Sequence, residues 1–182
     1  MENLSLDLEW NKDWDYLTKV KRPSRYIGGE WGLLPPKDDE ENIISLCLAY
    51  PDVYEGGMSY LGYQILYFLV KSLDFADVDR VYAPWPDMEE MLAKDGVPLR
   101  SLEMKKPLRK FDLLGFTLQY ELNATNILTM LNLSSIPLRS ADRGDEDPIV
   151  IAGGPGALAP MPYTPFIDVF CMGDCEELLV EL

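Results

Sequence analysis

Short apolar runs alternate with longer amphipathic segments along the chain from residue 43 onward. Five of these runs have the length of strands that are buried on both faces, as the strands of a parallel sheet are. We expect the strands at 43–50, 79–84, 111–117, 149–152 and 167–172. Because predicted helices separate the runs, the connections are βαβ crossovers, which give a mostly parallel five-stranded sheet.

Helical spacing and capping signals predict helices at 58–73, 87–95, 123–133 and 176–182. In the first of these helices, one apolar stripe is expected to face the core, and it consists of Met58, Leu61, Ile65, Phe68 and Leu69. Together the elements predict an α/β fold. The expected form is a flavodoxin-like (Rossmann-like) three-layer sandwich with strand order 2-1-3-4-5.

The first 42 residues differ from the rest and predict an aromatic-rich N-terminal arm with a connection, ahead of an α/β domain at 43–182. We expect a short helix at 9–19 and an exposed connection at 35–41. The segment 21–30 is expected to be irregular, because a proline and a glycine pair interrupt it. Five aromatic side chains are expected to fix the arm to the domain: Trp10, Trp14, Tyr16, Tyr26 and Trp31.

Apolar residues make up 47% of the 182 residues and charged residues 26%, which is ordinary for a soluble globular domain. No apolar run approaches the roughly 20 residues of a membrane-spanning helix. Met1 is followed by acidic and polar residues, unlike the start of a secretory signal. We therefore expect a cytoplasmic protein without a membrane partner.

The 31 acidic and 16 basic residues give a net charge of −15, which repels phosphate backbones. Direct nucleic-acid binding by this chain is therefore not expected. One local basic cluster is expected to dock onto the acidic body of the domain, in preference to binding an anionic ligand or RNA. It consists of Lys19, Lys21, Arg22 and Arg25.

The chain has no histidine, which removes the commonest general base, the Ser-His and Cys-His nucleophile pairs and most zinc sites. Of its three cysteines, Cys47 lies in an apolar run and is expected in the core. Cys171 and Cys175 are spaced Cys-x-x-x-Cys across a strand end and a turn, which is a weak case for a metal. Reduced structural thiols are the favoured interpretation, and a further ligand from another domain or chain is left open.

In a doubly wound sheet a ligand lies beyond the carboxyl ends of the strands, where the strand order switches. The loops expected there are 51–58, 118–126, 153–160 and 173–177. They lack the Gly-x-Gly-x-x-Gly and Gly-Lys-Ser/Thr signatures, but their glycines leave a strand end open to a flat ligand. The candidate cofactor contacts are Tyr54, Glu55, Gly57, Ser59, Gln119, Tyr120, Asn123, Gly153, Gly154 and Gly173. Helix capping is the alternative role for Asn123.

Six sequence blocks follow one another along the chain: 21–30 (KRPSRYIGGE), 50–55 (YPDVYE), 57–62 (GMSYLG), 83–89 (APWPDME), 115–122 (GFTLQYEL) and 152–155 (AGGP). Together they resemble the N-terminal region of a family of radical S-adenosylmethionine proteins that have a cobalamin-binding-like domain and no assigned reaction. The resemblance covers nearly the whole chain. A Gly-Gly-Pro turn, then Asp168, then the segment 173–177, is similar to cobalamin-binding radical enzymes more generally.

The resemblance implies an accessory domain of an iron–sulfur enzyme, with no catalysis by this fragment alone. The family's cluster motif, Cys-x-x-x-Cys-x-x-Cys, is absent. S-adenosylmethionine and a 4Fe-4S cluster are therefore expected only in a catalytic domain beyond Leu182, which is also the expected partner. The chain stops there inside an apolar helix without a stop signal, so we expect a piece of a longer protein.

The cobalamin loop Asp-x-His-x-x-Gly is absent as well. The resemblance therefore implies that any cobalamin is bound without a histidine ligand. Loss of the cofactor with retention of the fold is the open alternative.

Two other functions remain open from the sequence. A non-enzymatic docking module would use Trp10, Trp14 and Trp31 together with Trp85, which lies between two prolines, and would bind no cofactor. A flavin- or phosphate-binding flavodoxin-like domain would hold an anion at the first loop, although the phosphate signatures are missing.

Overall fold

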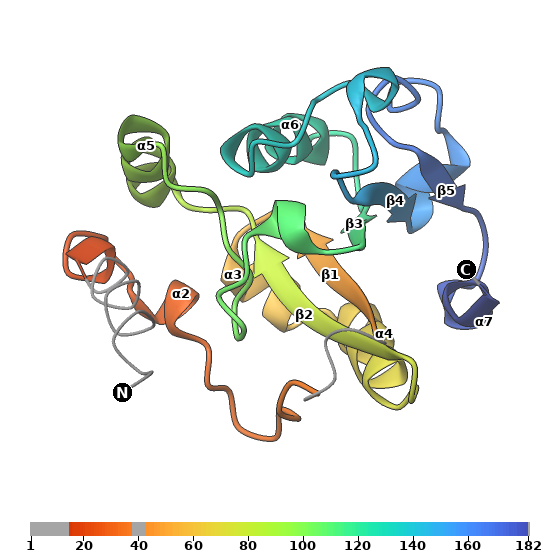
Figure 1. The fold of residues 1–182 in the computed structure, drawn as a ribbon, viewed down its shortest axis with the longest axis horizontal. Helices are drawn as coiled ribbons and strands as arrows, with labels where there is room; N and C mark the ends of the chain where they lie inside the picture. The colour runs from red at the N-terminus through yellow and green to blue at the C-terminus, as the bar shows by residue number, and fades with distance from the viewer. Residues whose placement is uncertain (1–14, 38–42, 182) are drawn as a thin grey trace.

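The computed structural model describes residues 15–37 and 43–181 (Figure 1). The strands are β1 (Ile44–Tyr50), β2 (Ala76–Tyr82), β3 (Leu113–Thr117), β4 (Ile149–Gly153) and β5 (Val169–Cys171). Neighbouring strands are parallel throughout and stand in the order β2-β1-β3-β4-β5. This confirms the five-stranded, flavodoxin-like order that the sequence predicts.

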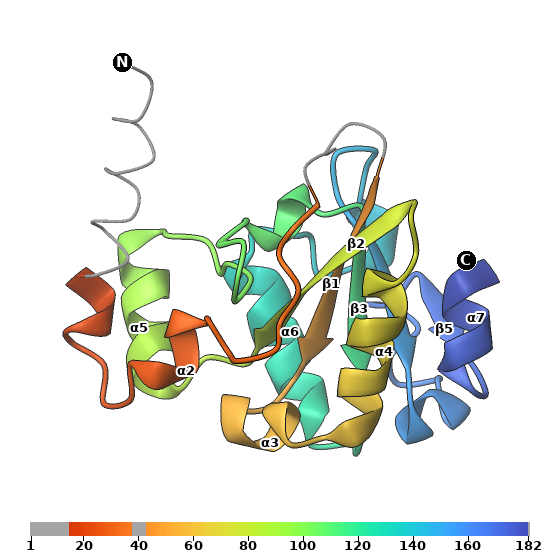
Figure 2. The ribbon, with the colours of Figure 1, turned by 90° about the horizontal axis from the view of Figure 1, so that it is seen from below.

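The helices are α2 (Ser24–Ile27), α3 (Tyr54–Met58), α4 (Leu61–Lys71), α5 (Pro86–Asp95), α6 (Asn123–Leu133) and α7 (Cys175–Glu181). Short 3-10 turns lie at η1 (Leu108–Lys110), η2 (Ser140–Asp142) and η3 (Pro155–Leu158). Figure 2 shows α5 and α6 on one side of the sheet and α4 and α7 on the other. The three-layer sandwich is therefore confirmed.

The sheet divides the core into two halves because side chains alternate along each strand. On β1, Cys47 and Ala49 join the half that packs under α5 and α6, whereas Leu46 and Leu48 join the half under α4. All four side chains are buried. Burial on both faces explains why the strands appear in the sequence as continuous apolar runs.

The predicted core face of α4 is wrong. Leu61, Ile65 and Phe68 are 71%, 42% and 46% exposed. The buried face carries Tyr63 and Tyr67 instead, and the Tyr63 hydroxyl donates to the Leu48 carbonyl oxygen at 2.7 Å. The helix also starts later than predicted, because the separate short helix α3 contains Met58.

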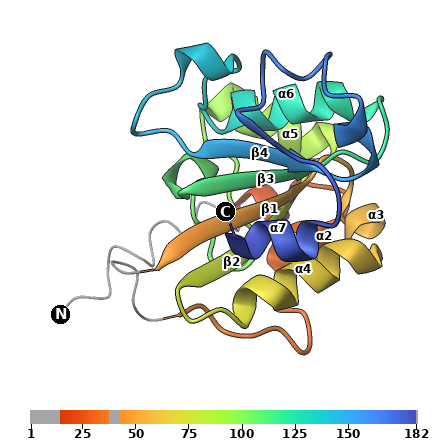
Figure 3. The ribbon, with the colours of Figure 1, turned by 90° about the vertical axis from the view of Figure 1, so that its right-hand side faces the viewer.

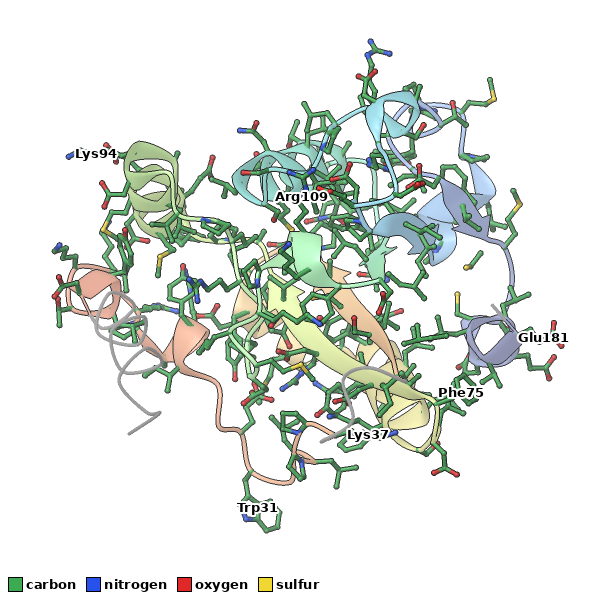
Figure 4. All side chains as sticks on the ribbon, viewed as in Figure 1. Trp31, Lys37, Phe75, Lys94, Arg109 and Glu181 are labelled. Carbon is green, nitrogen blue, oxygen red and sulfur yellow. The ribbon has the colours of Figure 1, made fainter. Side chains whose placement is uncertain are left out.

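The arm lies along the edge of the sheet at β2 and beside α5, as the orange ribbon in Figure 2 shows. Tyr16 is buried, and the Tyr26 hydroxyl accepts a hydrogen bond from the Trp85 backbone N–H at 3.0 Å, so both aromatics fix the arm as predicted. Trp31 does not, because it is fully exposed and projects away from the molecule in Figure 4. Trp10 and Trp14 lie outside the described residues.

Three further predictions concern the backbone and the basic residues of the arm. The segment 21–30 is not wholly irregular, because Pro23 leads directly into α2 with the backbone angle φ of −57° that its ring favours. The basic cluster docks onto the domain as predicted: Arg22 and Arg25 form ion pairs with Glu55 at 2.8 and 3.0 Å. Of the predicted helix 9–19, the described part is helical over residues 15–17.

A buried arginine joins the arm to β2. Arg80 has no exposed side-chain surface, and its Nη2 lies 2.8 Å from Glu30 Oε2 of the arm and 3.5 Å from Glu103 Oε1. Both contacts are ion pairs. The guanidinium also lies 4.9 Å from the centre of the Tyr67 ring. β2 is therefore polar in sequence yet buried along its whole length.

A second buried pair lies at the other end of β2, where Lys71 Nζ is 2.5 Å from Asp77 Oδ1. Lys37 of the arm contacts the same carboxylate through its backbone N–H at 2.9 Å, and its ammonium group donates to the carbonyl oxygens of Leu73 and Ala76. The edge of the sheet is thus covered by side-chain and backbone groups of the arm. None of the helices in the described part of the chain is long and apolar enough to span a membrane.

Candidate ligand-binding site

A cavity of about 180 Å³ lies at the carboxyl ends of β1, β3, β4 and β5. Its walls include residues of α4 and α7, which lie side by side on this face of the sheet (Figure 3). The cavity lies where the strand order reverses, because the chain places β2 on one side of β1 and β3 on the other. Such a switch point is where open α/β sheets place their ligands.

Two glycines allow other groups to pack closely against this end of β4. A Cβ atom on Gly153 would lie 2.7 Å from Cys175 Sγ, and one on Gly154 would lie 3.0 Å from the Leu118 carbonyl oxygen. Gly154 also has a φ of +97°, which disfavours other residues. The glycine pair therefore permits close packing of the loop against β3 and α7.

Thr117 lines the cavity and is not among the candidate contacts of the sequence analysis. It ends β3 on the same face as Gly115 and is only 8% exposed. Its Oγ1 has no hydrogen-bond partner among the described residues. An unsatisfied buried hydroxyl costs about 1–3 kcal/mol, so a polar ligand atom at this point would relieve that cost. The signal in the sequence was a hydroxyl residue at a predicted strand end.

The charged side chains at the cavity are acidic. Asp174 and Glu176 line it and are exposed, and the described lining contains no lysine or arginine. Such a lining does not favour a phosphate group. The flavin- or phosphate-binding alternative therefore gains no support from this cavity.

Two thiols lie beside Gly153. The point that its Cβ would take is 2.7 Å from Cys175 Sγ and 3.6 Å from Cys171 Cβ. Cys171 is buried and Cys175 half-buried. Within residues 15–37 and 43–181, no three cysteine, aspartate or glutamate side chains gather into a set that could hold a metal ion.

Four of the ten predicted contacts line the cavity together: Gln119, Gly153, Gly154 and Gly173. The other six lie outside its lining: Tyr54, Glu55, Gly57, Ser59, Tyr120 and Asn123. Two of these six connect neighbouring loops. The Tyr120 hydroxyl donates to Asp52 Oδ2 at 2.7 Å, and Asn123 Nδ2 donates to the Pro51 carbonyl oxygen at 3.0 Å.

The remaining predicted contacts hold α3 and the arm in place. Tyr54 donates to Glu30, and burial together with this carboxylate raises the pKa of Tyr54 to about 12. Glu55 carries the ion pairs to the arm. Gly57 packs under aromatic rings, and the Ser59 hydroxyl donates to the Glu55 carbonyl oxygen at 3.0 Å. These groups are engaged with protein partners in the structure.

A second cavity, of about 120 Å³, lies between the arm, α5 and β2. Apolar and aromatic side chains dominate its lining, among them Tyr16, Tyr26, Met88 and Leu92. It lies on the opposite side of the sheet from α4, and the sequence analysis did not anticipate it. Its existence depends on the arm, whose aromatic residues form one wall.

Cys175 provides a pH-dependent reporter of the strand-end cavity. Burial raises its pKa above the ordinary value, and the carboxylates of Glu176 and Asp174 add to this against a hydrogen bond with the Gly154 backbone. Because the thiolate is the reactive form, alkylation by a maleimide should accelerate about tenfold per pH unit between pH 7 and 9. Glutathione labelled in parallel should level off earlier, and an earlier plateau for Cys175 would contradict the assignment.

The chain matches the family model described as radical SAM proteins, N-terminal, over residues 62–182. No curated protein and no solved structure gives a match. The matched region begins in α4 and contains β2 to β5 and most of the cavity lining. Because the match covers more than half of the chain, the resemblance to radical SAM proteins is confirmed at the level of the family. The chain belongs to the radical SAM proteins, as their N-terminal domain.

Proposed function

We propose that this chain is an accessory domain of a radical SAM enzyme and that it binds one end of a larger ligand in its strand-end cavity. The observation that carries the proposal is a cavity at the switch point of the sheet whose buried Thr117 hydroxyl has no partner among the described residues. S-adenosylmethionine and the 4Fe-4S cluster belong, in this proposal, to a separate catalytic domain, which is the partner of this one.

The size of the cavity limits how cobalamin could fit. A cavity of about 150 Å³ lined by apolar side chains accommodates a benzene molecule. The strand-end cavity, at about 180 Å³, therefore admits one ring system but not a corrin. Cobalamin fits only with the ring of its nucleotide tail inserted and the corrin outside, and without a histidine ligand, since the chain contains none.

In that arrangement the role of the chain is to bind cobalamin and to orient it. Thr117 and Gln119 would hold the polar edge of the inserted ring, and the glycine turn at 153–154 would lie against its flat face. The apolar walls from Leu48 and Ile151 would exclude water. Cobalamin, when bound, supplies cobalt-centred group-transfer chemistry.

Titration with hydroxocobalamin and methylcobalamin, followed by visible absorbance and calorimetry, tests this proposal. We expect micromolar or tighter binding, weakened about tenfold by Thr117→Val and by Gln119→Ala, since a lost hydrogen bond is worth about 1 kcal/mol or more. Ser59→Ala is the control, because Ser59 lies outside the cavity lining. Absence of binding to this chain and to the full-length protein would contradict the cobalamin assignment, as would binding that both cavity variants leave unchanged.

A second candidate, the docking module without a cofactor, is favoured by the exposed apolar face of α4. Leu61, Ile65 and Phe68 form this face. Trp85 is a weaker candidate for a docking surface, because the Arg25 guanidinium of the arm already stacks on its ring, 4.6 Å from the ring centre. This candidate predicts concentration-dependent self-association in sedimentation velocity that Ile65→Ser and Phe68→Ser abolish. A monomeric chain that binds cobalamin would exclude it.

A further inference from the structure

We propose that three contacting tyrosine rings conduct an electron through the α4 side of the core, from Tyr54 beside the arm to a one-electron oxidant at the strand-end cavity. The oxidant is an organic radical that takes up the electron. Such conduction is a redox function of the protein interior, and it goes beyond the ligand binding proposed above because it does not depend on which ligand the cavity holds. Tyr63, Tyr82 and Tyr54 together are called the tyrosine relay.

The rings of the tyrosine relay form a continuous path between the two cavities. Tyr63 lines the strand-end cavity, and its ring centre lies 5.7 Å from that of Tyr82. The ring centre of Tyr82 lies 5.1 Å from that of Tyr54, and both of these residues line the cavity beside the arm. A side branch runs from Tyr63 to Tyr50 at 5.7 Å and on to Tyr60 at 6.0 Å. Aromatic pairs in contact have ring centres about 4.5–7 Å apart, so an electron can pass from ring to ring without crossing a saturated gap.

The two inner phenols cannot hold the oxidised state, because neither has a base that could take its proton. The Tyr63 hydroxyl is buried and donates to the carbonyl oxygens of Leu48 and Val81, which are too weakly basic to accept a proton. The Tyr82 hydroxyl has no hydrogen-bond partner among the described residues, and the charge that acts most strongly on it is the Arg80 cation. Burial raises the pKa of both phenols, so they stay protonated in the resting protein. An oxidised ring that keeps its proton is a buried cation, which is costly, so it takes an electron from the next ring.

Tyr54 can hold the oxidised state because its hydroxyl donates to a carboxylate oxygen of Glu30. Burial and this carboxylate raise the pKa of Tyr54 to about 12, so the phenol keeps its proton until it is oxidised. When Tyr54 gives one electron to oxidised Tyr82, its O–H bond breaks and the proton bonds to Glu30. The products are a neutral phenoxyl radical and a neutral carboxylic acid, and Arg80 retains Glu103 as a counter-ion at 3.5 Å. A one-electron reductant at the half-buried Tyr54 reverses the step, with the proton returned by Glu30.

The test places a photo-oxidant at the strand-end cavity. A ruthenium polypyridyl maleimide is attached to Cys175, which lines the cavity and is the most accessible of the three thiols. A light flash in the presence of a cobalt(III) electron acceptor then converts the label to ruthenium(III), which withdraws one electron from the protein. We expect a tyrosyl radical in the electron paramagnetic resonance spectrum of the unaltered chain and the loss of this signal in Tyr54→Phe.

A break in the middle of the tyrosine relay tests the path. Tyr82→Phe keeps the ring and its packing but replaces the phenol by a ring that is much harder to oxidise. It should slow formation of the radical at least about tenfold, which corresponds to a barrier higher by about 1.4 kcal/mol. Tyr67→Phe is the control, because Tyr67 is also buried on α4 but its ring packs against Phe68, outside the relay.

The proton acceptor is tested with two glutamine variants. Glu30→Gln removes the base and should slow formation of the radical at least about tenfold, because a hydrogen bond to a charged acceptor is lost. Glu103→Gln removes a carboxylate from the same Arg80 guanidinium but not the partner of Tyr54, and it should leave the rate unchanged. Equal rates in the two glutamine variants, or in Tyr82→Phe and the unaltered chain, would overturn the proposal. A radical that survives Tyr54→Phe would overturn it as well, and so would the absence of any tyrosyl radical.

Discussion

Arg80→Met should lower the free energy of unfolding by about 3–5 kcal/mol, because removal of one partner leaves buried charge uncompensated. Two carboxylates, Glu30 and Glu103, would lose their cation, and their side chains are only 15% and 22% exposed. That residual exposure places the expected loss near the lower figure. Urea unfolding followed by circular dichroism measures it.

The surface pair of the arm provides the control for this substitution. Arg22 is 64% exposed and pairs with Glu55, so Arg22→Met should cost less than about 1 kcal/mol. Adding Glu30→Gln and Glu103→Gln to Arg80→Met should recover part of the lost stability, because the orphaned charges are removed. Equal losses for Arg80→Met and Arg22→Met would show that the buried network contributes nothing special.

Two adjacent glycines of α3 should respond to alanine in opposite directions. A Cβ atom on Gly57 would lie 2.5 Å from Tyr82 Cε1 and 2.7 Å from Tyr50 Cγ, so Gly57→Ala should destabilise by about 1–3 kcal/mol through overpacking. A Cβ atom on Gly56 would meet its nearest atom at 3.8 Å, and Gly56→Ala should stabilise by about 0.5–1 kcal/mol through lower backbone entropy of the unfolded chain. Thermal unfolding of both variants measures the difference.

This pair also tests why Gly57 is a glycine. If Gly57→Ala kept full stability but abolished ligand binding, Gly57 would be a cofactor contact, as the sequence predicts. Its role would then not be close packing against the tyrosine rings. Gly56→Ala serves as the internal reference for helix propensity, since both residues lie in the same turn of α3.

The central strands of the sheet were predictable because they are buried on both faces. The runs at β1, β3 and β4 are almost wholly apolar. Each is too short for a helix and lies between two predicted helices, so a buried strand is the structure that fits it. β2 was predicted to start at 79 and starts at Ala76. The first half of β2 contains Asp77 and Asp79. Their burial depends on Lys71, which pairs with Asp77, and on the backbone N–H groups of residues 103–104, which donate to Asp79. Such distant partners leave no local pattern.

The orientation of α4 was not predictable from its apolar spacing. The helix has an apolar stripe through Leu61, Ile65 and Phe68 and an aromatic stripe through Tyr63 and Tyr67. The tyrosines are buried because their polar ends find partners, Tyr63 at the Leu48 carbonyl oxygen and Tyr67 beside Arg80. A hydropathy pattern ranks leucine above tyrosine and has no means of detecting these partners.

The candidate site was predictable where the backbone fixes it. Glycines at 153, 154 and 173 lie at or just after strand ends, and the topology alone brings strand ends together. Two residues chosen from the first loop lie outside the cavity and are engaged by the arm: Glu55 with Arg25, and Tyr54 with Glu30. Thr117 was not among the candidate contacts, because its unsatisfied hydroxyl emerges only from the packing around it.

The arm covers the edge of β2, and this edge is exposed while the chain is being synthesised. Contacts of the arm reach partners 24 to 79 positions later in the chain, from Tyr54 to Lys105. At about 5–20 residues per second, the ribosome delivers the arm several seconds before Glu103 can complete its anchor. Until then the edge of the newly made β2 is open to any other nascent strand. The arm is thus made before the last of its partners, and chaperones that shield strand edges would act on this chain in that interval.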